Sequence, residues 1–158
     1  ETIKNALDVL YEGGQIMREI LFRGKRVENG EWVYGAYYGL CRITNKDGGF
    51  EYEHLMHQSN NEPLYMVDPE TVGEYTGLTD KNGKRIFEGD IVRYRPEYWC
   101  EPLQSVVEYY ADKWNYPAFD LKDHDYEGNG LQFAHEEGVW LEVIGNIHDN
   151  PELLEVKE

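Results

Sequence analysis

The sequence is poor in basic residues and in cysteine. Of its 158 residues, 15 are Lys or Arg and 31 are Asp or Glu, which gives a formal net charge of −16. A chain this acidic repels phosphate backbones, so ordinary binding to DNA or RNA is disfavoured. The two cysteines, Cys41 and Cys100, are too few to staple a chain of this length. We interpret both as buried free thiols of a protein that works in a reducing cytosol.

Long apolar runs are also absent. No stretch of 18 apolar residues occurs, so the sequence predicts no membrane-spanning helix. The first residues lack a basic region followed by an apolar run, so no secretory signal is expected. We therefore expect a cytoplasmic protein without a membrane partner.

What the sequence does contain is aromatic side chains and unevenly placed acids. Aromatic residues make up 14% of the chain and include 13 tyrosines, which favours a packed core over disorder. Residues 1–96 carry 16 acidic and 12 basic residues, whereas residues 97–158 carry 15 acidic and 3 basic ones. The charge therefore favours the second part of the chain as the contact for a basic partner.

Short aromatic and β-branched runs separated by turn signals predict a mainly β protein, either a barrel or a sandwich. Asn29-Gly30 lies between two such runs, 19–27 and 32–40, and Asn-Gly is a strong hairpin signal. Asn82-Gly83 and Glu88-Gly89 mark further turns. Helical spacing is confined to the first thirteen residues and to a final turn opened by Asn150-Pro151. Further strands are predicted at 40–44, 50–54, 64–67, 90–94, 105–110, 114–121 and 139–145.

One segment resembles the signature of a known family. Residues 75–92, YTGLTDKNGKRIFEGDIV, resemble the signature of the YopX family of phage and prophage proteins. The opening residues 18–25 and 32–35 and the closing residues 142–154 also resemble that family. The resemblance covers about residues 17–155, nearly the whole chain. It implies a bacterial host cell, and it implies no catalytic residues.

The resemblance also implies a fold, a pair of small β-barrels of which the second is SH3-like. We accordingly predict a mainly β chain with two small β-barrel-like subdomains, residues 17–70 and residues 71–158, the second SH3-like. A short N-terminal helix is expected in an extension over residues 1–16. Met17 offers an alternative start for the chain, so whether this extension is native stays open.

The signature segment has a structural interpretation. Gly89 suits a turn, and Asp90 is expected to accept hydrogen bonds from nearby amides at the start of a strand. Its apolar members should then be core, namely Ile86, Phe87, Ile91 and Val92. The alternative is a binding role for its polar members, namely Asp80, Lys81 and Arg85.

Motifs that carry chemistry are incomplete. Residues 77–84 miss the spacing of a phosphate-binding loop, which requires four residues between its glycines. Residues 123–128 begin like a calcium loop, but Ala134 stands where the bidentate Glu of position 12 is required. We interpret the segment as a solvated acidic loop, with weak divalent binding as the alternative. His54 and His57 share one side only in a helix; on a strand they would point to opposite faces. We predict no catalytic residue, no metal site and no cofactor, and therefore no enzyme.

The remaining candidates are aromatic and acidic residues of the second part. Exposed aromatics of an SH3-like barrel would line a peptide groove, whereas the alternative places them in the core. The partner-binding candidates are Trp99, Trp114, Tyr116, Asp123, Asp125 and Glu127.

Three functions follow from this composition. The first is a non-enzymatic protein-interaction module for a host or phage protein. The alternatives are an acidic decoy of nucleic acid that binds a basic host protein, and an enzyme with an unrecognised site. Nucleic-acid binding by an SH3-like barrel is disfavoured by the charge. A homo-oligomer is plausible because the apolar face of residues 3–11 has no obvious partner in a β-barrel.

Overall fold

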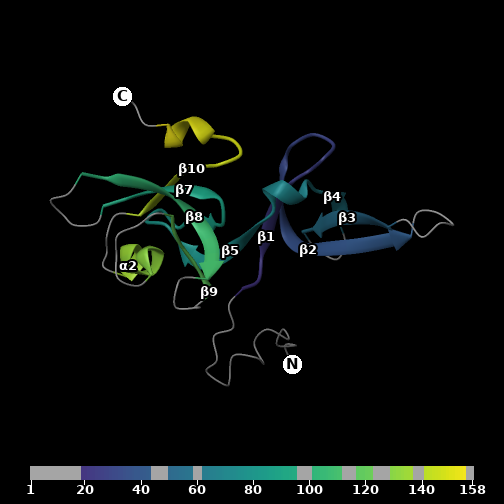
Figure 1. Cartoon of the computed structure of the whole chain (residues 1–158), viewed down its shortest axis with the longest axis horizontal. Helices are drawn as coiled ribbons and strands as arrows, with labels where there is room; N and C mark the ends of the chain where they lie inside the picture. The colour runs from purple at the N-terminus through teal and green to yellow at the C-terminus, as the bar shows by residue number, and fades with distance from the viewer. Residues whose placement is uncertain are drawn as a thin grey trace, which may run out of the picture.

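The computed structural model is mainly β and consists of two antiparallel sheets joined side by side (Figure 1). It describes residues 19–43, 50–58, 62–95, 101–111, 117–122, 129–136 and 141–155. The predicted helical extension, residues 1–16, lies outside this part of the chain. The described part holds no helix long and apolar enough to cross a membrane.

The first sheet has six strands in the order β4-β3-β2-β1-β5-β6. The hairpin predicted at Asn29-Gly30 is confirmed, since β1 pairs with β2 across it and Gly30 has a φ of +72°. Gly83, with a φ of +79°, likewise turns β5 into β6. The strands are β1 (Phe22–Lys25), β2 (Trp32–Ile43), β3 (Phe50–His57), β4 (Tyr65–Met66), β5 (Gly73–Thr79) and β6 (Arg85–Phe87).

The second sheet has four strands in the order β10-β7-β8-β9. These are β7 (Asp90–Tyr94), β8 (Leu103–Ala111), β9 (Pro117–Leu121) and β10 (Glu142–Asn146). A core of ten buried residues lies against this sheet, and it includes Ile86 of β6 as well as Leu131 and Ala134 of a short helix. A smaller core around Val33, Met56 and Val67 belongs to the first sheet. The predicted core residues of the signature segment are confirmed as buried.

Helical structure is brief. The sequence did not predict α2 (Gly130–Glu136), because seven residues with two buried apolar positions show no clear period. One 3₁₀ turn, η2 (Pro69–Thr71), follows β4, and η3 (Pro151–Leu154) is the predicted final turn. Asn150 precedes η3 without making a side-chain cap bond to it.

Neither sheet closes into a barrel over the described residues, which corrects the expectation of two barrels. The reason is the β5–β6 hairpin, which serves both sheets. Its start pairs with β1, through Gly73 opposite Arg23, while Leu78 and Ile86 pack on the core of the second sheet. Strands from both sides of the predicted boundary at residue 70 therefore share the first sheet. The division into subdomains stays a prediction.

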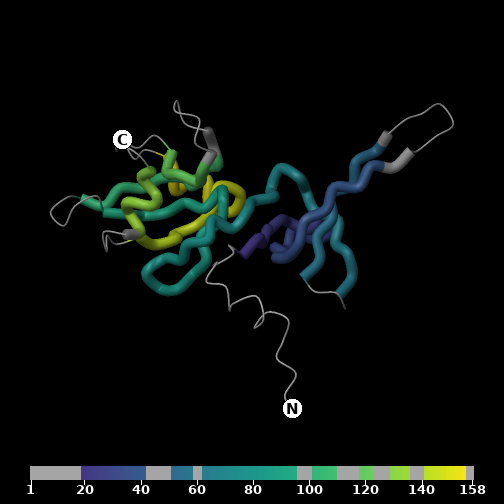
Figure 2. The backbone as a smooth tube through the Cα atoms, turned by 90° about the horizontal axis from the view of Figure 1, so that it is seen from below, coloured from purple at the N-terminus to yellow at the C-terminus, as the bar shows by residue number. Residues whose placement is uncertain are grey.

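Beyond β1, β2 and β3 continue as a ribbon that projects away from the second sheet, with the short β4 paired to β3 at its base (Figure 2). We call residues 36–43 and 50–57 the arm. Its register is continuous from Ala36 opposite His57 to Ile43 opposite Phe50. At its base, a Cβ added to Gly35 would lie 1.9 Å from the carbonyl oxygen of His57. Only glycine allows the backbones of β2 and β3 to come this close at the base of the arm.

Candidate functional site

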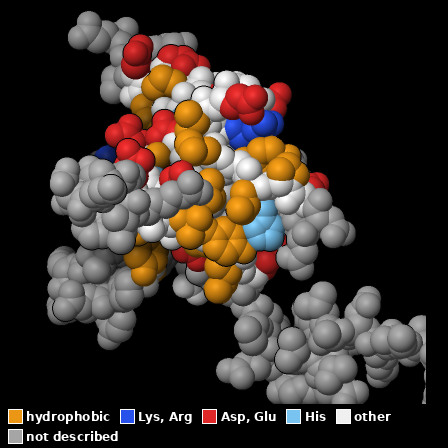
Figure 3. All heavy atoms as spheres, turned by 90° about the vertical axis from the view of Figure 1, so that its right-hand side faces the viewer, with side chains coloured by type: hydrophobic (Ala, Val, Ile, Leu, Met, Phe, Trp, Pro, Cys, Tyr) orange, Lys and Arg blue, Asp and Glu red, His pale blue; other side chains and the backbone are white. Residues whose placement is uncertain are grey.

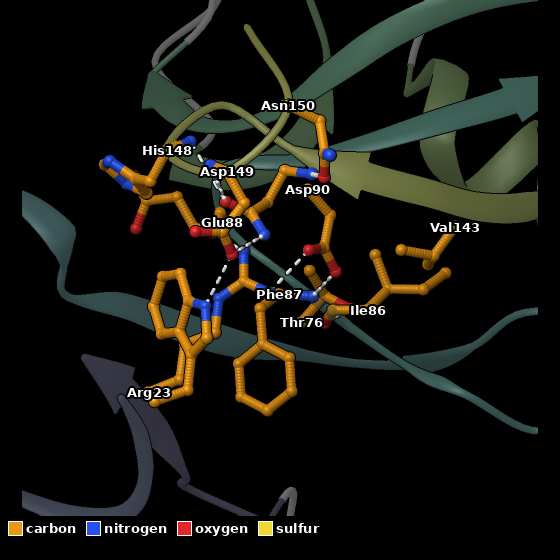
Figure 4. Close-up of polar contacts among 12 residues, drawn as sticks. Arg23, Thr76, Ile86, Phe87, Glu88, Asp90, Val143, His148, Asp149 and Asn150 are labelled. Carbon is orange, nitrogen blue, oxygen red and sulfur yellow. Dashed lines mark hydrogen bonds and ion pairs between the residues drawn. The ribbon is translucent and has the colours of Figure 1, made fainter. Parts of the chain in front are cut away.

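A buried ion pair joins the two sheets. Figure 4 shows Arg23 reaching from β1 toward Asp90 and Glu88 at the start of β7. Arg23 Nη1 lies 2.5 Å from Asp90 Oδ1, and Arg23 Nη2 donates to the carbonyl oxygen of Glu88 at 3.0 Å. The Phe87 amide donates to the other carboxylate oxygen of Asp90 at 2.8 Å, as the sequence predicted for this aspartate. Both side chains are buried, so the pair is a structural link between the sheets.

The electrostatics of this pair agree with that role. Burial raises the pKa of Asp90, while the Arg23 charge and the Phe87 amide act in the opposite direction. The Arg23 guanidinium also lies over two rings, 4.8 Å from the centre of Trp32 and 5.1 Å from that of Phe87. Both carboxylate oxygens of Asp90 are thus engaged within the chain, as an anchor requires.

A second polar contact ties the loop after β10 to the first sheet. Trp32 Nε1 donates to Asp149 Oδ2 at 2.7 Å, and Lys25 forms an ion pair with the other carboxylate oxygen. Hydrogen bonds from Asn146, Lys25 and Trp32 hold the pKa of Asp149 well below its usual range. Burial lowers the pKa of His148 beside it, and the charges of Arg23 and Lys25 add to the effect. The loop is therefore an extension of the same anchor (Figure 4).

The polar residues of the signature segment are also structural. Asp80 Oδ1 accepts from the amides of Asn82 and Lys84, and its Oδ2 accepts from the amide of Val143 on β10. Burial alone would raise the pKa of Asp80, but these amides outweigh it and the pKa lies below its ordinary value. Lys81 pairs with Glu142 at 3.1 Å. These contacts favour the structural interpretation of Asp80 and Lys81 over the binding role.

The arm exposes apolar side chains on one face. Tyr38 and Leu40 of β2 are each 43% exposed, and Met66 of β4 is 49% exposed. The register places Tyr38 opposite Leu55 and Leu55 opposite Met66, so these side chains lie on the same side of the sheet. We call this surface, formed by Ala36, Tyr38, Leu40 and Met66 around the buried Leu55, the arm face. Two polar residues of β3 share it, because Glu53 lies opposite Leu40 and His57 lies opposite Ala36. Figure 3 shows hydrophobic side chains gathered beside a histidine at the end of the molecule that carries the arm.

Histidines fix the tyrosines of the arm. His57 Nε2 and the Tyr38 hydroxyl lie 2.7 Å apart, and the two rings stack with centres 5.2 Å apart. His54 stacks on Tyr37 in the same way and bonds its hydroxyl. Because β3 is a strand, the two histidines point to opposite faces, so they do not form a metal-binding pair. Instead the stacking holds Tyr38 in one orientation on the arm face.

The sequence-predicted binding residues fall outside the described residues. This applies to all six, Trp99, Trp114, Tyr116, Asp123, Asp125 and Glu127, and their role stays a prediction. The calcium-like segment, 123–128, and Cys100 lie outside as well. Cys41 was interpreted as buried, which is wrong: it is exposed because the arm has no described element over it.

Sequence reasoning missed the arm face. Its only signal was the length of the alternating run from residue 32 to residue 43, with Tyr34, Tyr38 and Leu40 on one side. That alternation does not show which of the two faces of the strand packs against the rest of the protein and which is exposed to solvent.

Together the features define a mainly β protein of two linked sheets, with a projecting apolar arm and a buried polar anchor. Residues 21–155 match the family model described as "YopX protein". The chain belongs to the YopX family, which confirms the resemblance drawn from the sequence.

Among solved structures, the chain is similar to protein EF1440 from Enterococcus faecalis, known from a crystal structure. The two share 26% sequence identity with a TM-score of 0.50, over 88% of this chain and 100% of that chain. The comparison with curated proteins finds no match.

Proposed function

We propose that the chain is a non-enzymatic protein-interaction module whose arm face binds a partner protein. The observation that carries this proposal is the exposed apolar sheet face around Tyr38, Leu40 and Met66. Exposed apolar side chains that gather on one face are costly to leave in water and mark interaction sites in soluble proteins. Beyond β4 the arm is a two-stranded ribbon, which is marginally stable on its own, so this part gains stability when another surface covers it.

The side chains of the arm face suit a binding role. Aromatic side chains are enriched at the centres of protein interfaces, where a rigid ring loses little entropy on binding. Tyr38 is such a ring, because His57 already fixes its orientation. The Tyr38 hydroxyl contacts His57, while the exposed part of its ring faces water. A partner can therefore bury the ring without breaking the contact between Tyr38 and His57.

The partner we propose is a basic protein of a bacterial host or of a phage, met in the host cytoplasm. A net charge of −16 favours association with a basic surface and raises the rate of encounter at low salt. The second sheet, three of whose four strands lie in the more acidic part of the chain, would then steer the partner while the arm face supplies the apolar contact.

We further propose that the second sheet is an SH3-like half-barrel. Three contacts support this: β5–β6 packs on its core, Asp80 at the hairpin tip bonds to β10, and the amide of Gly89 donates to the carbonyl of Val107 at 2.8 Å. The candidate groove around Trp99, Trp114 and Tyr116 belongs to this proposal.

Differential capture tests the proposed function. The tagged chain and its Leu40→Glu variant are used as baits in phage-infected host cells, and captured proteins are quantified by mass spectrometry. The matched control is Leu103→Glu, which adds the same charge at an exposed leucine of β8. We expect a protein retained by the wild type and by Leu103→Glu but reduced about tenfold by Leu40→Glu. Equal capture by all three baits would contradict the role of the arm face.

The charge distribution favours a second candidate, an acidic decoy of nucleic acid. Residues 97–158 carry 15 acidic residues against 3 basic ones, an excess that a nucleic-acid-binding surface of a host protein would recognise. Capture would then compete with DNA and weaken steeply with salt. The test is capture at about 0.5 M salt, roughly three times the physiological ionic strength. Capture that persists at this salt concentration argues for the arm face and against the decoy.

A further inference from the structure

The outer edge of the arm is open. Residues 36–43 of β2 pair with β3 on one side, while β1 pairs only with residues 32–35 on the other. The described residues before β1 turn away, because the carbonyl of Leu21 accepts from the amide of Tyr75 on β5. Among the described strands, none covers this edge beyond Gly35. An open edge presents backbone donors and acceptors that another β-strand satisfies.

The edge carries none of the usual protection against pairing. Natural edge strands are blunted by Lys, Pro, bulges or inward charges. From Ala36 to Cys41 the edge reads AYYGLC, with no charge and no proline, and its register with β3 has no bulge. The first charged residue, Arg42, lies opposite Glu51 of β3.

Gly39 in the middle of this edge has no role within the described chain. It is not among the glycines with positive φ, and a Cβ added to it would meet no described atom within 4 Å. Glycine in the interior of a strand weakens it, and it often marks a place where another backbone approaches closely. The contrast with Gly35, whose Cβ would collide with His57 of the same chain, suggests that Gly39 meets another chain.

We propose that a second copy of this chain occupies the edge, with the two β2 strands antiparallel about a two-fold axis at Gly39. In this register Tyr38 lies opposite Leu40 of the second copy, and Tyr37 lies opposite Cys41 of the second copy. Such a contact is self-complementary, as a two-fold dimer requires. The result is one continuous sheet through both arms, β3-β2-β2-β3, which leaves the arm faces side by side and exposed.

Charge favours a second copy at this place despite the acidity of the chain. The arm carries one basic and two acidic residues, Arg42, Glu51 and Glu53, so it is nearly neutral. It projects away from the four-stranded sheet, so pairing through the arms keeps the strongly acidic parts far apart (Figure 2). Screening over about 10 Å at ordinary salt then removes most of their repulsion.

The oligomeric state of the full chain tests this proposal, measured by size-exclusion chromatography with multi-angle light scattering. We expect the wild type to show twice the mass of one chain. Gly39→Glu fits the single chain because its Cβ meets no described atom, but it opposes two like charges at the axis, so we expect one chain mass. Gly39→Ala adds only a methyl group where the two backbones approach, so it should weaken the dimer less than Gly39→Glu does. Leu103→Glu adds the same charge elsewhere and should remain dimeric. Circular dichroism verifies that each variant is folded.

Crosslinking checks the register independently. In a Cys100→Ser background, Cys41 of the two copies would lie about 14 Å apart, four residues along the strands and one strand across. A flexible bismaleimide of about that span should link them, and Cys41→Ser should abolish the link.

A wild type that stays at one chain mass overturns the proposal, and so does a dimer that Gly39→Glu leaves intact. Neither result touches the proposed function, because that rests on partner capture by the arm face. Since Leu40 would also lie opposite Tyr38 of the second copy, the mass of Leu40→Glu is measured too, so that lost capture is not mistaken for a lost dimer. A monomeric wild type would leave the edge to a strand of a different protein.

Discussion

Arg23→Met is expected to destabilise the protein strongly at neutral pH and much less in mild acid. The substitution keeps an apolar stem between the rings of Trp32 and Phe87, but it removes the partner of Asp90. The lone carboxylate must then stay charged without a partner or take up a proton. Breaking a buried ion pair from one side typically costs about 3–5 kcal/mol.

Protonation sets an upper limit to this penalty. The pKa of an aspartate in the unfolded chain is about 3.9. Keeping its side chain protonated in the folded protein costs about 1.4 kcal/mol for each pH unit above that pKa, which is about 4 kcal/mol at pH 7. At pH 5 the same limit is about 1.5 kcal/mol. The lost bond to the Glu88 carbonyl adds about 1 kcal/mol at either pH.

Urea unfolding at pH 7 and pH 5 measures this difference. The loss of unfolding free energy relative to the wild type should shrink by about 2.5 kcal/mol at pH 5. A variant too unstable to fold at pH 7 should regain a cooperative transition at pH 5. The control is Arg85→Met, which removes an exposed pair with Glu19 and should cost about 0.5 kcal/mol or less at both values. A penalty for Arg23→Met that is equal at both pH values, or below about 1 kcal/mol at pH 7, would refute the reasoning.

Three further substitutions probe the anchor and the base of the arm, each by urea unfolding. Gly35→Ala should lower the unfolding free energy by about 2 kcal/mol or more, because its Cβ would overlap the His57 carbonyl; an unchanged midpoint would show that the arm can shift. Asp80→Ala should cost about 3 kcal/mol by leaving buried amides without an acceptor, and a loss below about 1 kcal/mol would contradict this. Trp32→Phe should cost about 0.5 kcal/mol at pH 7, because half-exposed Asp149 loses one donor. The pKa of Asp149 is lowered by folding, so its ionised form stabilises the fold above the unfolded pKa, and that contribution is lost as pH falls toward the folded pKa. The Trp32→Phe penalty should therefore shrink in strong acid to what the smaller ring over Arg23 loses, and a penalty that grows there would contradict this.

Local signals in the sequence were sufficient for the turns and for much of the strand pattern. Asn29-Gly30 and Asn82-Gly83 specify hairpins because positive φ at the glycine sets the direction of the chain. The interactions of Asp90 with a nearby amide also follow from its position after a glycine. These features depend on residues a few positions apart, which the sequence displays directly.

The anchor and the open sheets depend on distant residues and escaped prediction. Arg23 and Asp90 are 67 positions apart, and neither carries a local sign of its partner. The β5–β6 hairpin pairs within the first sheet and packs on the core of the second. Counting strands in the sequence cannot show that two sheets share one hairpin, so the count predicted two closed barrels. Cys41 and Leu40 look like core residues in an alternating run, yet the structure shows them exposed on the arm.

Hydroxyl-radical footprinting of the complex tests most directly whether the arm face is an interaction surface. The chain is oxidised alone and with its captured partner, and modification of Tyr38 and Met66 is compared with that of Tyr109. Tyr109 lies on β8 of the second sheet and is 52% exposed, so it is a matched reference tyrosine. We predict that the partner lowers oxidation of Tyr38 and Met66 and leaves Tyr109 unchanged. Protection of Tyr109 with undiminished oxidation of Tyr38 and Met66 would contradict the proposal and move the interface to the second sheet.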